Sequence, residues 1–302
     1  MNSVITVGGK EIRVKGRMVR IARLEADLYH FLEDPETMLQ ALRDCGTQID
    51  VFSFMQRLPE TSPKYNFPME WDNLAAMPIT TFDDWWTNQI GFKARNKAKQ
   101  AEKKGVTVKE VRFDAALVKG IWEVYNETEV RQGRRNRHHG KDIETVYREE
   151  ATFLESSIFI GAYFEDSLIG FIKLVYDETR TQACSMNFVC MVRHRDKAPA
   201  NALVVQAVKT CVEHKIPYLA YSRFAYGKIE QSSLNEFKER NGFKRVDLPR
   251  YYVPLTPLGK LALRLQLHHR LSERLPAPVV AKLRALRAAW YDRKLPSAGG
   301  AT

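Results

Sequence analysis

The sequence has few cysteines and no long apolar run. Its 302 residues include four cysteines, with no CxxC pair and no spacing typical of metal ligands: Cys45, Cys184, Cys190 and Cys211. We therefore expect buried free thiols, with Cys184 and Cys190 on one face of a strand, and a reducing cytoplasm rather than a disulfide framework or a zinc site. A transmembrane helix needs about 18 or more apolar residues in a row, and the sequence has no such run. The first twenty residues also lack the features of a secretion signal, so the sequence predicts a cytoplasmic protein.

Charge is the unusual global property. Lys and Arg number 47 against 36 Asp and Glu, which gives a formal net charge of +11. Such an excess favours an anionic partner, which could be a nucleic acid, a phosphorylated cofactor or a lipid surface. Charge alone does not choose among the three.

Patterning divides the chain into four segments. Residues 1–80 are expected to form a small α/β segment, 81–255 the main domain, 256–295 a basic amphipathic helical extension and 296–302 a disordered tail. Within the first segment, alternation predicts strands at 11–14 and 18–22, and Asp34-Pro35 predicts the start of a helix. Residues 59–80 are rich in proline and turn formers, which favours a linker or covering loop.

The main domain has the pattern of an α+β fold. A strongly basic helix over 92–104 is followed by a strand and two more helices, the second of which should run to about residue 155. Three strands then form a meander at 157–164, 168–176 and 182–192, and a helix over 201–214 leads to strand–helix–strand. The pattern predicts a mixed, mostly antiparallel sheet flanked by helices.

The order of elements from 113 to 252 resembles the GNAT superfamily of acyltransferases. A narrower resemblance is to its Fem-like branch, whose members transfer aminoacyl groups from tRNA to peptidoglycan precursors or similar amines. Three stretches carry it: the basic helix with its following turn (95–106), the step Phe237–Phe243, and Arg131-Gln132-Gly133 after a helix. The residues before 90 could be a divergent version of the first of the two domains in Fem enzymes.

The resemblance implies a donor site in a split between two parallel strands, here 182–192 and 218–222. The loop that follows the first strand leads to a helix N-terminus, which is a natural phosphate site. Candidate donor-binding residues are Val192, Arg193, Arg195, Lys197 and Asn201. The glycines of the GNAT pattern are absent from this loop, and Pro199 removes one N–H group, so the sequence departs from a conventional acetyl-CoA cradle.

The leaving-group acid also departs from the GNAT pattern. Many GNAT enzymes place a tyrosine one turn before a Gly-Phe pair, and Lys238 holds that position here. Lys238, Tyr221 and Tyr226 are therefore candidates for the acid, and Glu230 is a candidate for the base. Asn187 and Ser222 are candidates for binding the acceptor. Arg131 and Arg134 begin a basic loop that could close over an anionic substrate.

The sequence therefore predicts an N-acyltransferase that moves an acyl or aminoacyl group from acyl-CoA or charged tRNA to an amine. The alternative is an inactive binding protein of the same fold that recognises RNA or an anionic membrane. The leucines of the C-terminal extension could lie on the inner face of a membrane, although packing on the domain is favoured. No metal is expected, and His268-His269 are assigned to a basic helix face.

Overall fold

The computed structural model of the protein describes residues 2–131, 134–225 and 232–269, together with residues 279, 282, 285, 286 and 290. In these residues eleven strands form one sheet in the order β1-β2-β3-β4-β13-β5-β12-β11-β10-β9-β6. Two neighbouring pairs, β3/β4 and β11/β12, are parallel and the other pairs are antiparallel. This confirms the predicted α+β class with a mixed, mostly antiparallel sheet.

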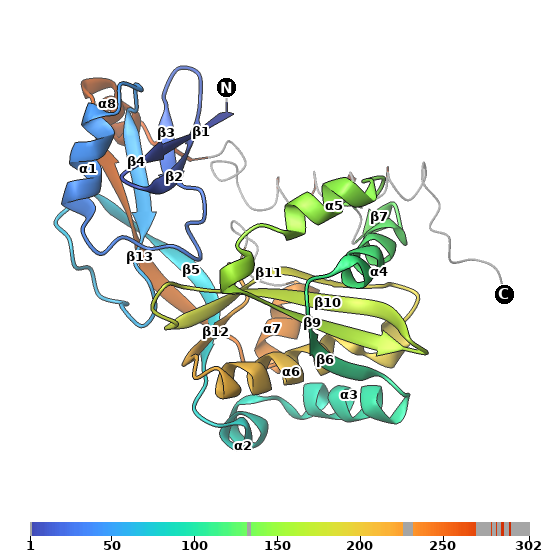
Figure 1. Cartoon of the computed structure of the whole chain (residues 1–302). Coiled ribbons are helices and arrows are strands. Elements are labelled where there is room, and N and C mark those ends of the chain that lie inside the picture. The colour runs from blue at the N-terminus through green and yellow to red at the C-terminus, as the bar shows by residue number, and fades with distance from the viewer. Residues whose placement is uncertain are drawn as a thin grey trace.

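Runs of strands are separated by helices along the chain, and Figure 1 shows their arrangement. The strands of the large sheet are β1 (Asn2–Val7), β2 (Lys10–Lys15), β3 (Ile21–Leu24), β4 (Val51–Met55), β5 (Met69–Pro78), β6 (Thr107–Val111), β9 (Ser157–Phe164), β10 (Ser167–Tyr176), β11 (Gln182–Cys190), β12 (Tyr218–Ala220) and β13 (Lys244–Pro254). The helices are α1 (Pro35–Asp44), α2 (Phe82–Asp84), α3 (Phe92–Lys103), α4 (Ala115–Asn126), α5 (Ile143–Glu150), α6 (Pro199–Glu213), α7 (Ser233–Arg240) and α8 (Pro257–Arg264). A short hairpin, β7 (Val130–Arg131) and β8 (Arg134–Arg135), lies outside the sheet.

Helices cover both faces of the sheet around β9–β11. In Figure 1, α3 and α6 lie on one face and α4 and α5 on the other. Leu203, Val208 and Ile172 belong to the apolar cluster on the α6 face, while Ile121 and Phe171 belong to the cluster beneath α4. Residues 2–55 form a smaller lobe of β1–β4 and α1 with its own apolar cluster.

Strand β5 corrects the prediction for residues 59–80. Met69–Pro78 is not a covering loop, because it pairs with β12 on one side and β13 on the other. Leu74, Ala75, Ala76 and Met77 are all buried, since consecutive side chains pack on opposite faces of the sheet. The strand therefore lacks the apolar–polar alternation by which a half-buried strand is recognised. The large sheet therefore contains strands from both sides of the expected boundary at residue 80.

Two smaller predictions are also corrected. Helix α5 ends at Glu150, and the chain then reverses through Phe153, which has a φ of +56°. Leu258, Leu261, Leu265 and Leu267 of the C-terminal extension are exposed, Leu263 is half-buried, and α8 buries Gly259 and Ala262. A Cβ on Gly259 would lie 1.9 Å from the carbonyl oxygen of Asp50, so only glycine permits this close approach. No helix in the described part of the chain is long and apolar enough to cross a bilayer.

Candidate functional site

The predicted split between two parallel strands lies where β11 and β12 separate. Their pairing covers Gln182–Cys184 and Tyr218–Ala220 only, while β11 continues to Cys190. Beyond β12 the chain turns, and Ser222 has a φ of +83°. This left-handed conformation is uncommon for serine, and such strain tends to occur at functional positions. Tyr221 and Ser222 are held beside β5 by backbone hydrogen bonds of 2.7 and 2.8 Å with Ala75.

A bulge in β11 decides which way its side chains point. The register with β10 pairs Ser185 with Leu174 and Asn187 with Lys173, so Met186 has no opposite residue. The extra residue reverses the alternation of β11. Asn187 consequently faces α5. Cys184 and Cys190 pack in apolar clusters on opposite faces of the sheet, so the prediction that they lie on one face is wrong. Bulges are common beside active sites, where they redirect a side chain.

The side chain that Asn187 reaches is Glu150, at the last turn of α5. Glu150 is 1% exposed, and its Oε1 accepts hydrogen bonds from Asn187 Nδ2 at 2.8 Å and from Tyr125 Oη at 2.7 Å. Its Oε2 is also buried and has no hydrogen-bond partner among the described residues. A buried carboxylate oxygen without a partner is costly in a purely structural role, so it marks Glu150 as a candidate functional group.

Two further groups shape the electrostatics around Glu150. Lys173 is fully buried and its ammonium donates to the carbonyl of Glu150 at 2.8 Å. Burial lowers the pKa of Lys173 to about 8, although the nearby Glu150 opposes this. Burial, followed by Glu150, raises the pKa of Tyr125 well above its usual value, so the phenol remains a hydrogen-bond donor.

His138 extends this polar cluster outward. Its ring stacks on Tyr125 with centroids 4.0 Å apart, and its buried Nδ1 has no hydrogen-bond partner among the described residues. Burial and then the charge of Arg137 lower the pKa of His138 to about 3, so the imidazole is neutral near pH 7. The cluster of Glu150, Tyr125, Lys173, Asn187 and His138 is called the Glu150 cluster below.

The opposite side of the split is aromatic. Tyr221 packs against Phe188, Phe237 and Phe243, with ring centroids 5.3, 6.3 and 5.6 Å apart. Lys238 Nζ lies 5.0 Å from the centre of the Tyr221 ring and donates to the carbonyls of Arg223 and Phe224. Burial lowers the pKa of Lys238 to about 8. Since Lys238 is fully buried, its ammonium holds the segment after β12 in place.

A carboxylate from another part of the chain binds the start of the predicted donor loop. Glu127 follows α4, and its two carboxylate oxygens accept from the backbone N–H groups of Val192 and Arg193, each at 2.7 Å. Arg131 reaches the same carboxylate at 3.4 Å and also donates to the carbonyl of Cys190. Arg131, Val192 and Arg193 were each candidate binding residues, and the structure brings them together. The residue that joins them is Glu127, which the sequence analysis did not single out.

The remaining predicted residues are distributed over the surface near this loop. Arg193, Arg195 and Arg134 are exposed, and Lys197 lies over the ring of Phe164. Asn201 donates to Asn241 Oδ1 at 3.2 Å, which ties α6 to the end of α7. Tyr226 and Glu230 lie outside the described residues. Neither Glu150 nor Glu127 has a sequence signal beyond its place at a helix end.

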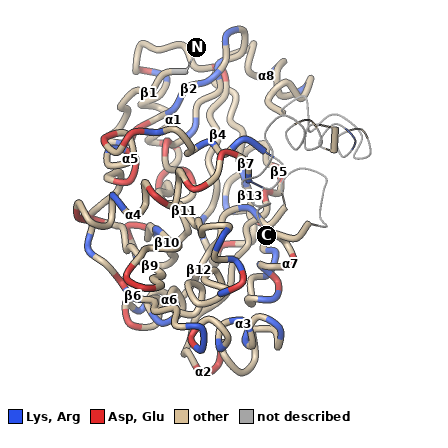
Figure 2. The backbone as a smooth tube through the Cα atoms, turned by 90° about the vertical axis from the view of Figure 1, so that its right-hand side faces the viewer, with Lys and Arg blue, Asp and Glu red and all other residues tan. Residues whose placement is uncertain are grey.

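A basic surface lies next to the donor loop. Helix α3 packs on α6 through Ala94, Ala98 and Ala101, which leaves its lysines outside. The exposed cations on this helix and its C-cap are Lys93, Lys97, Lys99, Lys103 and Lys104, and Figure 2 shows the blue segments along α3. Lys104 connects this surface to the loop through contacts of 3.0 and 3.2 Å with Asp196.

A surface pocket elsewhere on the molecule shares no residue with the split. It is lined by residues that include Phe31, Gln56, Arg57 and Lys64, beside β4. Strands β13 and β5 separate β4 from β12, so this pocket takes no part in the candidate site.

Comparison with known proteins supports the fold. The sequence matches no protein-family model and no curated protein. Among solved structures, the C-terminal domain of an Agrobacterium fabrum protein named as a lysylphosphatidylglycerol synthetase has a TM-score of 0.58 at 13% identity, with 87% of each chain covered. L-PGS from Bacillus licheniformis has a TM-score of 0.54 at 12% identity, with 95% of this chain and 89% of that chain covered. FemX has a TM-score of 0.56 at 13% identity, with 88% and 90% covered. The chain therefore shares the fold of these three solved structures.

Proposed function

We propose that the protein is an aminoacyltransferase that takes its acyl group from a charged tRNA and passes it to an amine. The observation that carries the choice of donor is the carboxylate of Glu127 on the N–H groups of Val192 and Arg193. A loop that leads into a helix can bind the phosphates of a nucleotide cofactor through its backbone N–H groups and those of the first helical turn. Here an internal anion occupies the N–H groups at the start of the loop, and Pro199 provides no N–H group at the first position of α6.

The basic surface of α3 supports a polynucleotide donor. Its exposed lysines lie along one helix and continue to the loop at Lys104. Phosphates of a nucleic acid bind such an array mainly through charge, with a strong dependence on salt. An acyl-CoA donor would have fewer phosphates to offer to this surface, and it is the second candidate.

Glu150 is the residue that we assign as general base. The amine nitrogen attacks the ester carbonyl, and Oε2 of Glu150 accepts the proton that the nitrogen loses. The bond between the carbonyl carbon and the ribose oxygen then breaks, and the same proton passes to that oxygen. Hydrogen bonds from Asn187 and Tyr125 to Oε1 fix the carboxylate so that Oε2 is the oxygen that accepts.

Lys238 and Tyr221 are assigned to positioning. The Lys238 ammonium fixes the segment 223–224 and lies against the Tyr221 ring, which closes one side of the split. Beyond Cys184, β11 has no pairing with β12, and backbone N–H groups that point into such a split can stabilise the oxyanion of the tetrahedral intermediate.

A lipid acceptor is the alternative to a free amine. The name of one structural neighbour refers to lysylphosphatidylglycerol, which is a lipid. The exposed leucines of α8, together with Lys260 and Arg264, form a surface suited to an anionic bilayer.

The test incubates the full chain with a donor and an acceptor. The donors are tRNAs charged with labelled amino acids or acyl-CoA thioesters, and the acceptors are model amines or phosphatidylglycerol vesicles. Transfer of label from tRNA to an acceptor supports the proposal. Strong binding of tRNA or vesicles without transfer from any donor would instead support an inactive binding protein.

A further inference from the structure

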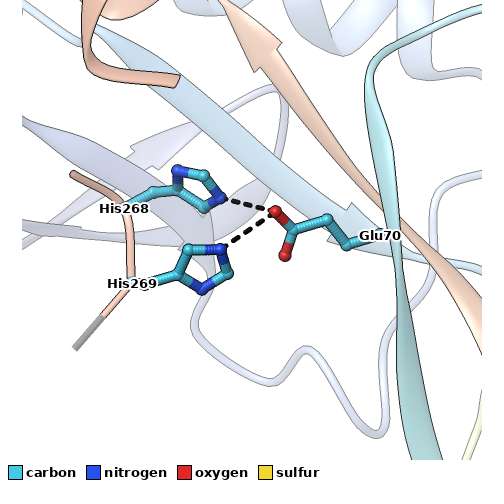
Figure 3. Close-up of side chains that lie close together, drawn as sticks. All are labelled: Glu70, His268 and His269. Carbon is cyan, nitrogen blue, oxygen red and sulfur yellow. Dashed lines mark hydrogen bonds and ion pairs between the residues drawn. The ribbon is translucent and has the colours of Figure 1, made fainter. Parts of the chain in front are cut away.

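Two histidines and a glutamate converge at the other end of β5, away from the split. Glu70 is the second residue of β5, and His268 and His269 follow α8. The Nε2 atoms of His268 and His269 lie 2.8 and 3.1 Å from Glu70 Oε1, as Figure 3 shows. The sequence assigned these histidines to a basic helix face. The structure corrects this, since they lie beyond the helix and the His268 side chain is only 4% exposed.

A turn after α8 aims both imidazoles in one direction. Gln266 has a φ of +54°, and Leu267 N–H returns to the carbonyl of Ala262 at 2.8 Å. The rings of His268 and His269 consequently lie side by side, with centroids 4.1 Å apart, and His268 also packs against Tyr252 at 4.6 Å. Neighbouring residues on a regular helix would point about 100° apart, so this convergence is a product of the turn.

We propose that Glu70, His268 and His269 bind a divalent transition-metal ion, for which Zn²⁺ is the best fit. Two imidazoles and one carboxylate are a ligand set that zinc uses, with the remaining position open to water. Bond lengths of about 2.0–2.2 Å in a tetrahedral site place the ligand atoms roughly 3.3 Å apart. The donor atoms of the three residues lie within 4.8 Å of one another, so a small opening of the two hydrogen bonds would admit the ion.

The orientation of the His268 ring is compatible with the ion. Its Nδ1 is buried without a hydrogen-bond partner in the described part of the chain, while its Nε2 faces Glu70. An imidazole binds a metal through one ring nitrogen and keeps a proton on the other, so this orientation is suited to an ion on Nε2.

Such a site would connect the C-terminal extension to the sheet. Glu70 and His268 are 198 positions apart in the sequence, and α8 otherwise packs through Gly259 and Ala262. An ion that binds the folded chain more tightly than the unfolded chain stabilises the fold. The role that the location supports is therefore structural, because the ligands belong to β5 and the extension and not to β11.

The test uses the full chain, stripped with a chelator and then titrated with ZnCl₂ by calorimetry and with Co²⁺ by visible absorption. We expect one tight site per chain, the d–d absorption of a low-coordinate cobalt ion, and a Tm that rises with zinc. The variants Glu70→Gln and His269→Ala should each weaken zinc binding by about 10–100-fold or more.

The control is His214→Ala, which removes a histidine that lies 3.5 Å from a different carboxylate, that of Glu110. This variant should bind zinc like the wild type. If Glu70→Gln fails to fold by circular dichroism, the conservative His269→Gln takes its place. Equal zinc affinity in the wild type and the ligand variants, or no zinc binding by the wild type below millimolar concentration, would overturn the proposal.

Discussion

The two faces of the sheet beside β11 are packed in different ways. On the α6 face, Phe188 lies among aromatic rings and joins a continuous apolar cluster. On the α5 face, its neighbour Asn187 reaches a buried carboxylate with one unsatisfied oxygen. Apolar packing stabilises a fold without further partners, whereas a buried polar cluster is costly unless every group is satisfied. Under the proposed function, the α6 face maintains the architecture and the α5 face carries the chemistry.

The largest expected effect comes from the polar face. Replacing Glu150 by Gln keeps the hydrogen bond from Asn187 but removes the base, so kcat for aminoacyl transfer should fall by about 10²–10⁴-fold. The matched control is Glu149→Gln on the same helix, which removes only an exposed ion pair with Lys141. Single-turnover kinetics with a charged tRNA would measure both. A Glu150→Gln enzyme with the activity of the control would remove Glu150 from the mechanism.

Charge reversal on α3 tests the basic surface that covers the α6 side of the sheet. Lys97→Glu combined with Lys99→Glu should weaken tRNA binding by about 10–100-fold, and each lost phosphate contact should reduce the slope of log K against log salt by roughly 0.7–0.9. The exposed Lys15→Glu on β2 serves as the control. Fluorescence anisotropy at several salt concentrations provides the measurement, and equal slopes for all three proteins would count against α3 as the tRNA surface.

The Glu127 contact between α4 and the donor loop should contribute to stability. Glu127→Ala leaves the N–H groups of Val192 and Arg193 without their carboxylate and removes the contact with Arg131. The free energy of unfolding should fall by about 1–3 kcal/mol, since hydrogen bonds to a charged group are lost. Glu129→Ala, which removes a pair at 3.9 Å, should change it by less than about 0.5 kcal/mol. Urea denaturation distinguishes the two, and equal losses would contradict the role of Glu127.

A smaller effect is expected from Lys238, and it depends on pH. Its pKa is lowered by burial to about 8, below the usual lysine value of 10.5. Between these pH values the unfolded chain binds more protons than the folded chain, so the Lys238 contribution to stability increases as pH rises from 8 to 10.5. The wild type should therefore gain about 1–2 kcal/mol over this window relative to Lys238→Met. Thermal unfolding as a function of pH measures this, and a constant difference between the two proteins would refute the lowered pKa.

Much of the fold could be read from the sequence, for reasons visible in particular elements. The caps Asp34 and Asp142 mark helix starts, and each accepts a hydrogen bond from the residue three positions later. The meander at β9–β11 follows apolar runs bounded by turns. Strand β5 could not be read in this way, because both its faces are buried and the surrounding prolines indicate a loop.

The site was less predictable than the fold. The split between β11 and β12 was implied by the family resemblance, and Asn187 was a candidate from its place on the strand. The face on which Asn187 lies depends on the bulge at Met186, and no residue type in β11 marks it. Glu150 and Glu127 resemble ordinary solvent-facing glutamates at helix ends, and only the three-dimensional structure reveals that they bind to β11 and its loop.

The most direct test of the account is a competition between donors. The wild-type protein would be incubated with a model amine and equal concentrations of aminoacyl-tRNA and acyl-CoA, and the products would be identified by mass. The account predicts that the amine gains the aminoacyl group and that the thioester is retained. Acylation of the amine from acyl-CoA, with the charged tRNA unchanged, would contradict it.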